Sequence, residues 1–264
     1  MRQASAAPHP PDGATKVLIT GAGSGIGARL AMLLSDVGHA IVVTDLDASA
    51  ASAVATHITD AGGVATSARL DVTNLTEVAE VVSAAGAIGV LVNNAGLQVV
   101  SSLEEFPADA WQQIIDVMLV GAASVSRAVL PGMRRRNFGR IVNIGSIHSL
   151  VASPYKSAYV AAKHGLLGLS KAIALETGDT NITINTICPA YVRTPLVEAQ
   201  IAAQARKHAL TPDQVVRTIM LKPMPKQVFV TPEEIAALTL FLISDSARNV
   251  TAQAIAIDGG WTAQ

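Results

Sequence analysis

The sequence has a single cysteine, Cys188. A lone cysteine excludes a disulfide framework, and it excludes a metal cluster built on the usual cysteine spacings. The simplest interpretation is a protein of a reducing compartment. We therefore expect a cytoplasmic location and no bound metal.

An excess of charge of one sign is also missing. The 19 lysines and arginines nearly balance the 20 aspartates and glutamates, so the formal net charge is -1. Basic blocks and basic stretches interleaved with aromatic residues are absent, which argues against binding to nucleic acid or to an anionic membrane. No charge-free run has the length and bulk of a transmembrane helix. Residues 1–14 lack the apolar stretch of a signal peptide, and we expect them to form a disordered tail.

From residue 15 onward, short runs of valine, isoleucine and leucine alternate with helical patterns, which include residues 25–37, 107–133, 157–178 and 232–242. Apolar runs without polar alternation are typical of strands buried on both faces of a parallel sheet. Seven runs are of this kind: KVLIT, AIVVTD, VATSARL, IGVLVNN, GRIVNIGS, NITINTIC and AIAID. The sequence therefore predicts an α/β fold, a Rossmann-type doubly wound parallel sheet of seven strands with helices on both faces.

No internal repeat or linker divides this pattern, so we expect a single domain over residues 15–264. One segment departs from the alternation. Residues from about 190 to 228 are rich in proline and only weakly periodic, and they precede the last predicted strand. An insertion of that length is usually functional, and we expect it to cover the substrate.

A glycine-rich turn, TGAGSGIG, follows the first predicted strand. Glycines let a backbone pass close to a pyrophosphate, and the N-terminus of the next helix offers free N–H groups and a positive dipole end. A turn of this kind without any ligand is the alternative that the motif alone leaves open.

The ends of the next strands favour a nucleotide. Asp45 follows the glycine turn by about 20 residues, where a carboxylate can accept hydrogen bonds from both ribose hydroxyls and repel a 2′-phosphate. No arginine or lysine directly follows Asp45 or lies in the glycine turn, so NAD is favoured over NADP. The alternative is that Asp45 caps the next helix, a role for which Asp47 is better placed. Asp71 could meet the adenine, and Asn93 either faces the ligand crevice or ties neighbouring strands together.

The stretch SAYVAAKHG places Tyr159 and Lys163 four residues apart, on one face of a helix. A free tyrosine has a pKa of about 10, and a nearby ammonium or the positive nicotinamide of an oxidised cofactor favours its phenolate. Ser146 ends the fifth predicted strand and could hold a substrate oxygen. Together these groups could move a proton to or from an alcohol or carbonyl while a hydride moves to or from nicotinamide. The alternative is an ordinary tyrosine–lysine pair on an exposed face.

The motifs TGAGSGIG, NNAG, YVAAK and PAYVRT, together with Ser146, resemble the short-chain dehydrogenase/reductase family from residue 15 onward. The resemblance implies that Ser146, Tyr159 and Lys163 are catalytic, that Lys163 also binds the nicotinamide ribose, and that Thr194 binds the carboxamide. It further implies a homotetramer paired through the helices around Trp111 and Tyr159. The expected cofactor site consists of Gly21, Ser24, Gly25, Ile26, Asp45, Asp71, Val72, Asn93, Ala95, Tyr159, Lys163, Pro189, Val192 and Thr194.

Two positions depart from the family pattern. Ala190 replaces the glycine that usually follows the proline, which is a mild change. Met118 lies where family members commonly carry an asparagine that relays protons through water to the lysine. A thioether holds such a water poorly, so the relay is in question.

Four further stretches resemble one group within the family, the D-3-hydroxybutyrate dehydrogenases: GLQ, SIHSLVASPYKSAYVAAKHG, ICPAYVRTPLVEAQI and DGGWTAQ. This resemblance implies that the substrate is held by Gln98, Ser146, His148, Lys156, Tyr159, Gln200 and Trp261. A small anion needs a cation and converging donors, which these residue types provide. Without the resemblance, Lys156 and His148 could equally be ordinary polar loop residues.

The resemblance implies an NAD-dependent oxidoreductase that interconverts (R)-3-hydroxybutyrate and acetoacetate, with Tyr159 as the acid and base. One alternative is a related dehydrogenase for another small hydroxy acid or a secondary alcohol. The other is an NAD-binding regulatory protein that has lost efficient catalysis, for which Met118 is the one supporting feature.

Overall fold

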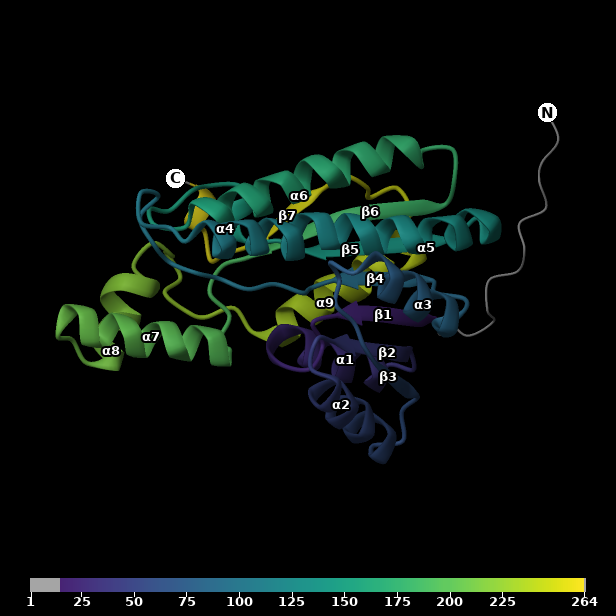
Figure 1. The fold of residues 1–264 in the computed structure, drawn as a ribbon, viewed down its shortest axis with the longest axis horizontal. Helices are drawn as coiled ribbons and strands as arrows, with labels where there is room; N and C mark the ends of the chain where they lie inside the picture. The colour runs from purple at the N-terminus through teal and green to yellow at the C-terminus, as the bar shows by residue number, and fades with distance from the viewer. Residues whose placement is uncertain (1–14, 264) are drawn as a thin grey trace.

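A computed structural model describes residues 15–263, so the segment predicted to be a disordered tail lies outside the described residues. The chain forms one parallel sheet of seven strands in the order β3-β2-β1-β4-β5-β6-β7 (Figure 1). This confirms the predicted α/β architecture and single domain. The strands are β1 (Lys16–Thr20), β2 (Ala40–Asp45), β3 (Ala65–Arg69), β4 (Val90–Asn93), β5 (Gly139–Ile144), β6 (Ile182–Pro189) and β7 (Ala254–Ile257).

Helices cover both faces of the sheet, as the unbroken apolar strands require. Side chains of α1, α2 and α9 share one buried cluster, and side chains of α3, α5 and α6 share the cluster on the other face. The helices are α1 (Gly25–Asp36), α2 (Ala48–Asp60), α3 (Leu75–Ala85), α4 (Ala108–Ile115), α5 (Ala122–Arg136), α6 (Ser157–Glu176), α7 (Pro195–His208), α8 (Pro212–Val215) and α9 (Pro232–Ile243).

The helix predicted over residues 107–133 is a continuous run with an internal irregularity. A π-helical turn, η1 (Asp116–Gly121), joins α4 to α5. By length and composition the run Ala108–Arg136 could cross a membrane. We interpret it as a core helix, because Ile114, Val125 and Met133 are fully buried and pack within the fold.

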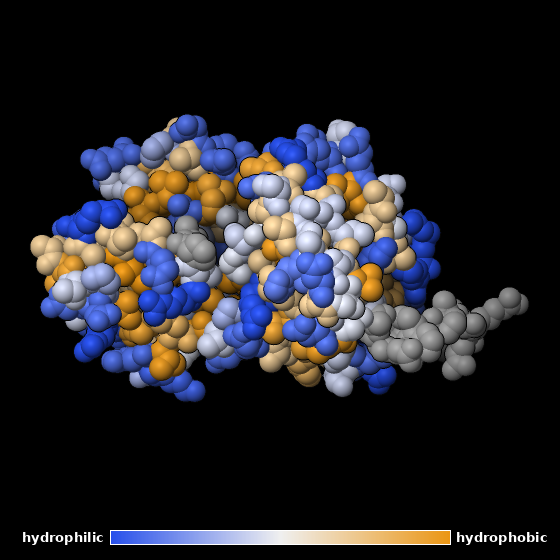
Figure 2. All heavy atoms as spheres, turned by 90° about the horizontal axis from the view of Figure 1, so that it is seen from below, coloured by the Kyte–Doolittle hydropathy of each residue, from blue (hydrophilic) through white to orange (hydrophobic). Residues whose placement is uncertain are grey.

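The segment predicted to cover the substrate folds into α7, α8 and a second π-helical turn, η3 (Val216–Met220). It has its own apolar cluster, which includes Ile201 and Val215. Its two ends meet, since Val192 and Val230 form a parallel bridge. Figure 1 shows α7 and α8 extending beyond the sheet on the side of the strands' carboxyl ends. On the same side of Figure 2, apolar side chains gather among hydrophilic ones.

Candidate functional site

A cavity of about 500 Å³ lies at the carboxyl ends of the strands, and it also reaches the covering segment through Gln200. Sheets of this kind bind ligands at that edge, where the strand order reverses between β1 and β4. All the predicted site residues but one line this cavity: Gly21, Ser24, Gly25, Ile26, Asp45, Asp71, Val72, Ala95, Gln98, Ser146, His148, Lys156, Tyr159, Lys163, Pro189, Val192, Thr194, Gln200 and Trp261.

Asn93 is the exception. Its side chain is buried, and its amide nitrogen donates hydrogen bonds to Ser126 Oγ at 3.1 Å and to Asn143 Oδ1 at 2.8 Å. It therefore ties β4 to α5 and β5, as the structural alternative predicted, and its role toward a cofactor stays a prediction. The neighbouring Asn94 lines the cavity and donates to the carbonyl oxygens of Thr20 and Gly21. Sequence inspection could not separate two adjacent asparagines in one motif.

The glycine turn packs closely against the backbone of neighbouring residues. Gly21 has a φ of 62°, and a Cβ built there would lie 2.8 Å from Ala95 Cα. A Cβ on Gly27 would lie 2.4 Å from the Gly21 carbonyl oxygen. Ser24, at the N-cap of α1, makes no side-chain cap hydrogen bond, which leaves the first N–H groups of the helix for a ligand. Close backbone and open donors fit the diphosphate of a dinucleotide.

Asp45 is held at the end of β2 by two backbone donors. Its Oδ2 accepts from Gly23 N at 2.9 Å, and its Oδ1 accepts from Asp47 N at 3.0 Å. Asp47, in turn, caps α2 by accepting from Ser49 N and Ala50 N, as expected for the better-placed of the two. Asp45 is therefore fixed at the cavity wall without serving as the helix cap.

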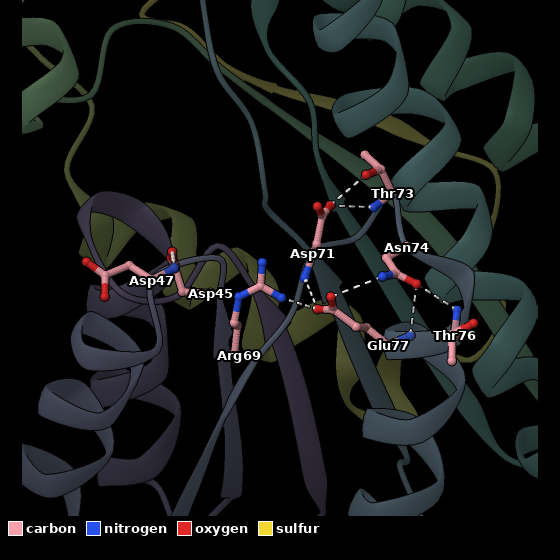
Figure 3. Close-up of polar contacts among 8 residues, drawn as sticks. All are labelled: Asp45, Asp47, Arg69, Asp71, Thr73, Asn74, Thr76 and Glu77. Carbon is pink, nitrogen blue, oxygen red and sulfur yellow. Dashed lines mark hydrogen bonds and ion pairs between the residues drawn. The ribbon is translucent and has the colours of Figure 1, made fainter.

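An arginine that the sequence analysis did not consider lies beside Asp45. Arg69 is its partner across the β2–β3 register, but its guanidinium pairs with Glu77 at 2.6 Å (Figure 3). Asp71, nearby, accepts from the backbone N and hydroxyl of Thr73, and these hydrogen bonds lower its pKa. The positive charge of Arg69 is thus already paired with the carboxylate of Glu77.

Ser146, Tyr159 and Lys163 come together at the inner part of the cavity. The chain turns sharply after β5, and Ser146 Oγ accepts from His148 N at 3.1 Å. Tyr159 and Lys163 lie one turn apart on α6, with the Lys163 ammonium 5.7 Å from the centre of the tyrosine ring. Lys163 donates to the Ile144 carbonyl oxygen. The arrangement can exchange a proton between Tyr159 and a small oxygen-bearing molecule.

Burial governs the ionisation of these groups. It raises the pKa of Tyr159, and the hydrogen bond with Ser146 opposes that shift without cancelling it. The sequence analysis expected the nearby ammonium to favour the phenolate, but in the protein alone desolvation prevails. Burial also lowers the pKa of Lys163 to about 8. At neutral pH Tyr159 keeps its proton and Lys163 is mostly charged.

A second cluster of polar side chains lies near Tyr159, whose ring is 6.1 Å from that of His148. The Lys156 ammonium is 3.4 Å from His148 Nε2, and Gln200 Nε2 donates to Gln98 Oε1 at 2.8 Å. Burial and the charge of Lys156 lower the pKa of His148 to about 4, so its imidazole is neutral and can accept from the ammonium. Burial also lowers the pKa of Lys156.

In this group one donor has no hydrogen-bond partner, and one cation has no counterion. The amide nitrogen of Gln98 is buried and has no hydrogen-bond partner. Among residues 15–263, no carboxylate forms an ion pair with Lys156. A half-buried ammonium without a counterion and a buried amide nitrogen without an acceptor are costly unless a ligand supplies the missing groups.

Two apolar neighbours complete the wall. Met118, on the π-helical turn, is buried against Ala158, Ala162 and Gly96 and lines the cavity. Tyr191, which the sequence analysis did not single out, has its ring 5.8 Å from that of Trp261. Its only sequence signal was its place within the PAYVRT motif.

Comparison with known proteins agrees with this geometry. The family model described as short chain dehydrogenase matches residues 15–205, and the chain belongs to this family. A protein of Rhizobium meliloti (strain 1021) named D-beta-hydroxybutyrate dehydrogenase is 43% identical over 255 residues, covering 94% of this chain and 98% of the relative. A protein of the same name from Cupriavidus necator is 43% identical, covering 94% and 97%. A cyclohexanol dehydrogenase of Acinetobacter sp. is 37% identical, covering 94% of each.

The chain is therefore a short-chain dehydrogenase, an oxidoreductase of a small-molecule substrate that uses a nicotinamide cofactor. The residues around the glycine turn fit such a cofactor. A side chain at Gly21 would collide with Ala95, so only glycine leaves this part of the backbone open to a ligand.

Proposed function

We propose that this protein is an NAD-dependent dehydrogenase that interconverts (R)-3-hydroxybutyrate and acetoacetate. The observation that carries the proposal is the half-buried Lys156 ammonium, which has no anionic partner among the described residues and shares a cavity with the unpartnered amide nitrogen of Gln98. A substrate carboxylate would satisfy both donors. The names of two relatives at 43% identity support the same substrate.

The choice of NAD rests on Asp45. Its carboxylate is fixed at the cavity wall, where it would accept from ribose hydroxyls and repel a 2′-phosphate. Arg69, opposite Asp45 on β3, is paired with Glu77 and offers little to a phosphate. When bound, the nicotinamide supplies or accepts the hydride. Thr194, which caps α7 beside the glycine turn, would hold its carboxamide.

Proton transfer falls to the chain's own residues. In reduction, the Tyr159 hydroxyl gives its proton to the ketone oxygen, and burial favours the protonated state that this requires. In oxidation, Tyr159 must first lose its own proton, and the charge of Lys163 favours the phenolate that results. This phenolate then accepts the proton of the alcohol and returns to the neutral phenol. Ser146 holds the reacting oxygen through its hydroxyl.

The substrate carboxylate would lie against Lys156, Gln98 and Gln200, with His148 completing the group and Trp261 closing the methyl end. Gln200 belongs to α7, so the covering segment contributes directly to binding. We also propose that the protein acts in the cytoplasm as a homotetramer paired through the helices around Trp111 and Tyr159, without nucleic acid or membrane partners.

A dehydrogenase for a neutral secondary alcohol is the second candidate. The apolar wall of Met118, Tyr191 and Trp261 would suit a ring, and one relative is named cyclohexanol dehydrogenase. A neutral alcohol, however, leaves the Lys156 ammonium without a counterion. The two functions therefore differ in the need for Lys156.

The first test is NADH formation by the wild-type protein with 3-hydroxybutyrate, other small hydroxy acids and neutral secondary alcohols. Preference for 3-hydroxybutyrate is expected, and activity confined to neutral alcohols would contradict the proposal.

The second test is Lys156→Ala. We expect kcat/KM for 3-hydroxybutyrate to fall by about ten- to a thousandfold, on the scale of a lost charge-assisted hydrogen bond of about 1.5–3 kcal/mol plus some misplacement. The methyl ester of the same acid should lose much less, and NAD affinity should hardly change. Lys222→Ala, at an exposed lysine of the covering segment, is the matched control. Equal losses for acid and ester would assign Lys156 a structural role.

A further inference from the structure

Lys156 is held from two sides, and only one of them is polar. His148 accepts from the ammonium on one side. On the other, the ammonium lies 5.6 Å from the centre of the Tyr191 ring. Cations are attracted to the face of an aromatic ring at this range, and more strongly when water is excluded. Lys156 is half-buried and lines the cavity, so its ammonium is partly shielded from water and the contact is stronger than at an exposed lysine.

The Tyr191 ring is itself fixed. The backbone carbonyl oxygen of Tyr191 accepts a hydrogen bond from Val230 N at 2.9 Å, which ties the residue to the base of the covering segment. Its ring packs against Trp261, whose turn is held by the Asp258 carboxylate through Gly260 N and Thr262 N. Trp261 also contacts His148 edge-on at 6.1 Å between ring centres. The two groups that flank Lys156 are thus joined through Trp261.

An aromatic neighbour can hold the Lys156 ammonium without neutralising its charge, which a carboxylate could not do. A carboxylate beside Lys156 would neutralise it and compete with an anionic substrate. A ring attracts the ammonium through its quadrupole but leaves the full charge available. A lysine side chain has a long flexible stem, so without such a contact its ammonium would sample many positions.

We propose that Tyr191 is a positioning residue that acts through Lys156: its ring face holds the ammonium in place for the carboxylate of the substrate while leaving its charge free. This deepens the proposed function and rests on it for the identity of the anion. The ring, and not the hydroxyl, carries the role.

The variants Tyr191→Leu and Tyr191→Phe separate the ring from the hydroxyl. We expect Tyr191→Leu to raise KM for 3-hydroxybutyrate by about three- to thirtyfold with a smaller change in kcat, on the scale of a desolvated cation–π contact. Tyr191→Phe should remain within about twofold of wild type, since the ring face persists. The methyl ester should be nearly unaffected by either change.

Tyr155→Leu is the matched control, because it removes another tyrosine–lysine contact of 5.6 Å, with Lys207, whose tyrosine is exposed. It should leave the ratio of acid to ester unchanged. Should Tyr191→Leu fail to fold, as judged by thermal melting, Tyr191→Met also removes the ring and leaves a longer, more flexible side chain to fill the space.

A binding measurement keeps this inference separate from the proposed function. Acetate and acetamide, as a charged and a neutral probe, are titrated into the protein with NAD by calorimetry. A selective loss of acetate affinity in Tyr191→Leu supports the positioning role even if wild type does not oxidise 3-hydroxybutyrate. Equal losses of both probes, no loss, or the same loss in Tyr191→Phe would overturn it.

Discussion

At the scale of single residues, burial decides how the site's ionisable groups behave. It raises the pKa of Tyr159, lowers that of Lys163 to about 8 and, with Lys156, lowers that of His148 to about 4. The phenol therefore starts protonated and His148 stays neutral through the physiological range. A neutral imidazole next to a charged lysine acts as an acceptor and not as a competing cation.

Tyr159→Phe tests the proton-transfer role most directly. The ring keeps its packing and only the hydroxyl is lost, so we expect turnover to fall below a few per cent of wild type in either direction. NAD affinity, measured by fluorescence titration, should change by less than about threefold, because the phenol is not the main cofactor contact. Tyr155→Phe, at an exposed tyrosine, serves as control. Substantial residual turnover would remove Tyr159 from its role.

Sequence inspection found residues whose neighbours in the site are close in the chain or belong to a recognisable motif. Tyr159 and Lys163 share a helix face, and Ser146 follows a strand. It missed contacts made only by folding. Arg69 lies opposite Asp45 in the register of the adjacent strands β2 and β3, and the Tyr191 ring lies 5.6 Å from the Lys156 ammonium. Neither neighbour relation can be read from spacing along the chain.

At the scale of elements, the central strands were predictable because unbroken runs of valine, isoleucine and leucine have few other uses in a chain of this kind. The edge strands β3 and β7 are partly exposed and follow this pattern less well. The π-helical turn η1 was not, since one extra residue per turn barely changes the apolar periodicity. The turn places the buried Met118 at the cavity wall, in the position where the family commonly has an asparagine.

The packing of α1 against the glycine turn gives an element-scale prediction. Gly27→Ala would place a methyl group 2.4 Å from the Gly21 carbonyl oxygen and 2.5 Å from Asn94 Nδ2. The helix must move away, so we expect a loss of about 1–3 kcal/mol in the free energy of unfolding and weaker NAD binding. Urea denaturation measures the first and calorimetry the second.

Gly132→Ala is the matched control, as a glycine in another helix whose added Cβ would meet only arginine side-chain tips. It should be neutral or stabilising by up to about 1 kcal/mol, because alanine favours helix. If the two substitutions behave alike, the tight turn is not what makes Gly27 necessary.

At the scale of the whole molecule, the strand order brings the parts of the site together. The order reverses between β1 and β4, and all strands are parallel, so their carboxyl ends open into one crevice. The covering segment enters at Val192 and returns at Val230 beside the same edge. Cofactor and substrate groups that are distant in the chain thus line a single cavity.

Because the cofactor would contact several elements at once, its binding should stabilise the entire fold. At about one hundred times its Kd, NAD should add about 2.7 kcal/mol, which corresponds to a rise in Tm of about 5–11 °C for a domain of this size. NADP at the same concentration should give a smaller rise, since Asp45 would repel its extra phosphate.

Asp45→Ala should reduce the rise in Tm caused by NAD and narrow the difference between the rises caused by NAD and NADP. Asp60→Ala, which removes an equal charge from the exposed end of α2, should leave both shifts unchanged. Differential scanning fluorimetry with matched cofactor concentrations measures all of these. A wild-type protein stabilised more by NADP than by NAD would show that Asp45 does not set the cofactor preference, and the pairing of Arg69 with Glu77 would then have to open to admit the phosphate.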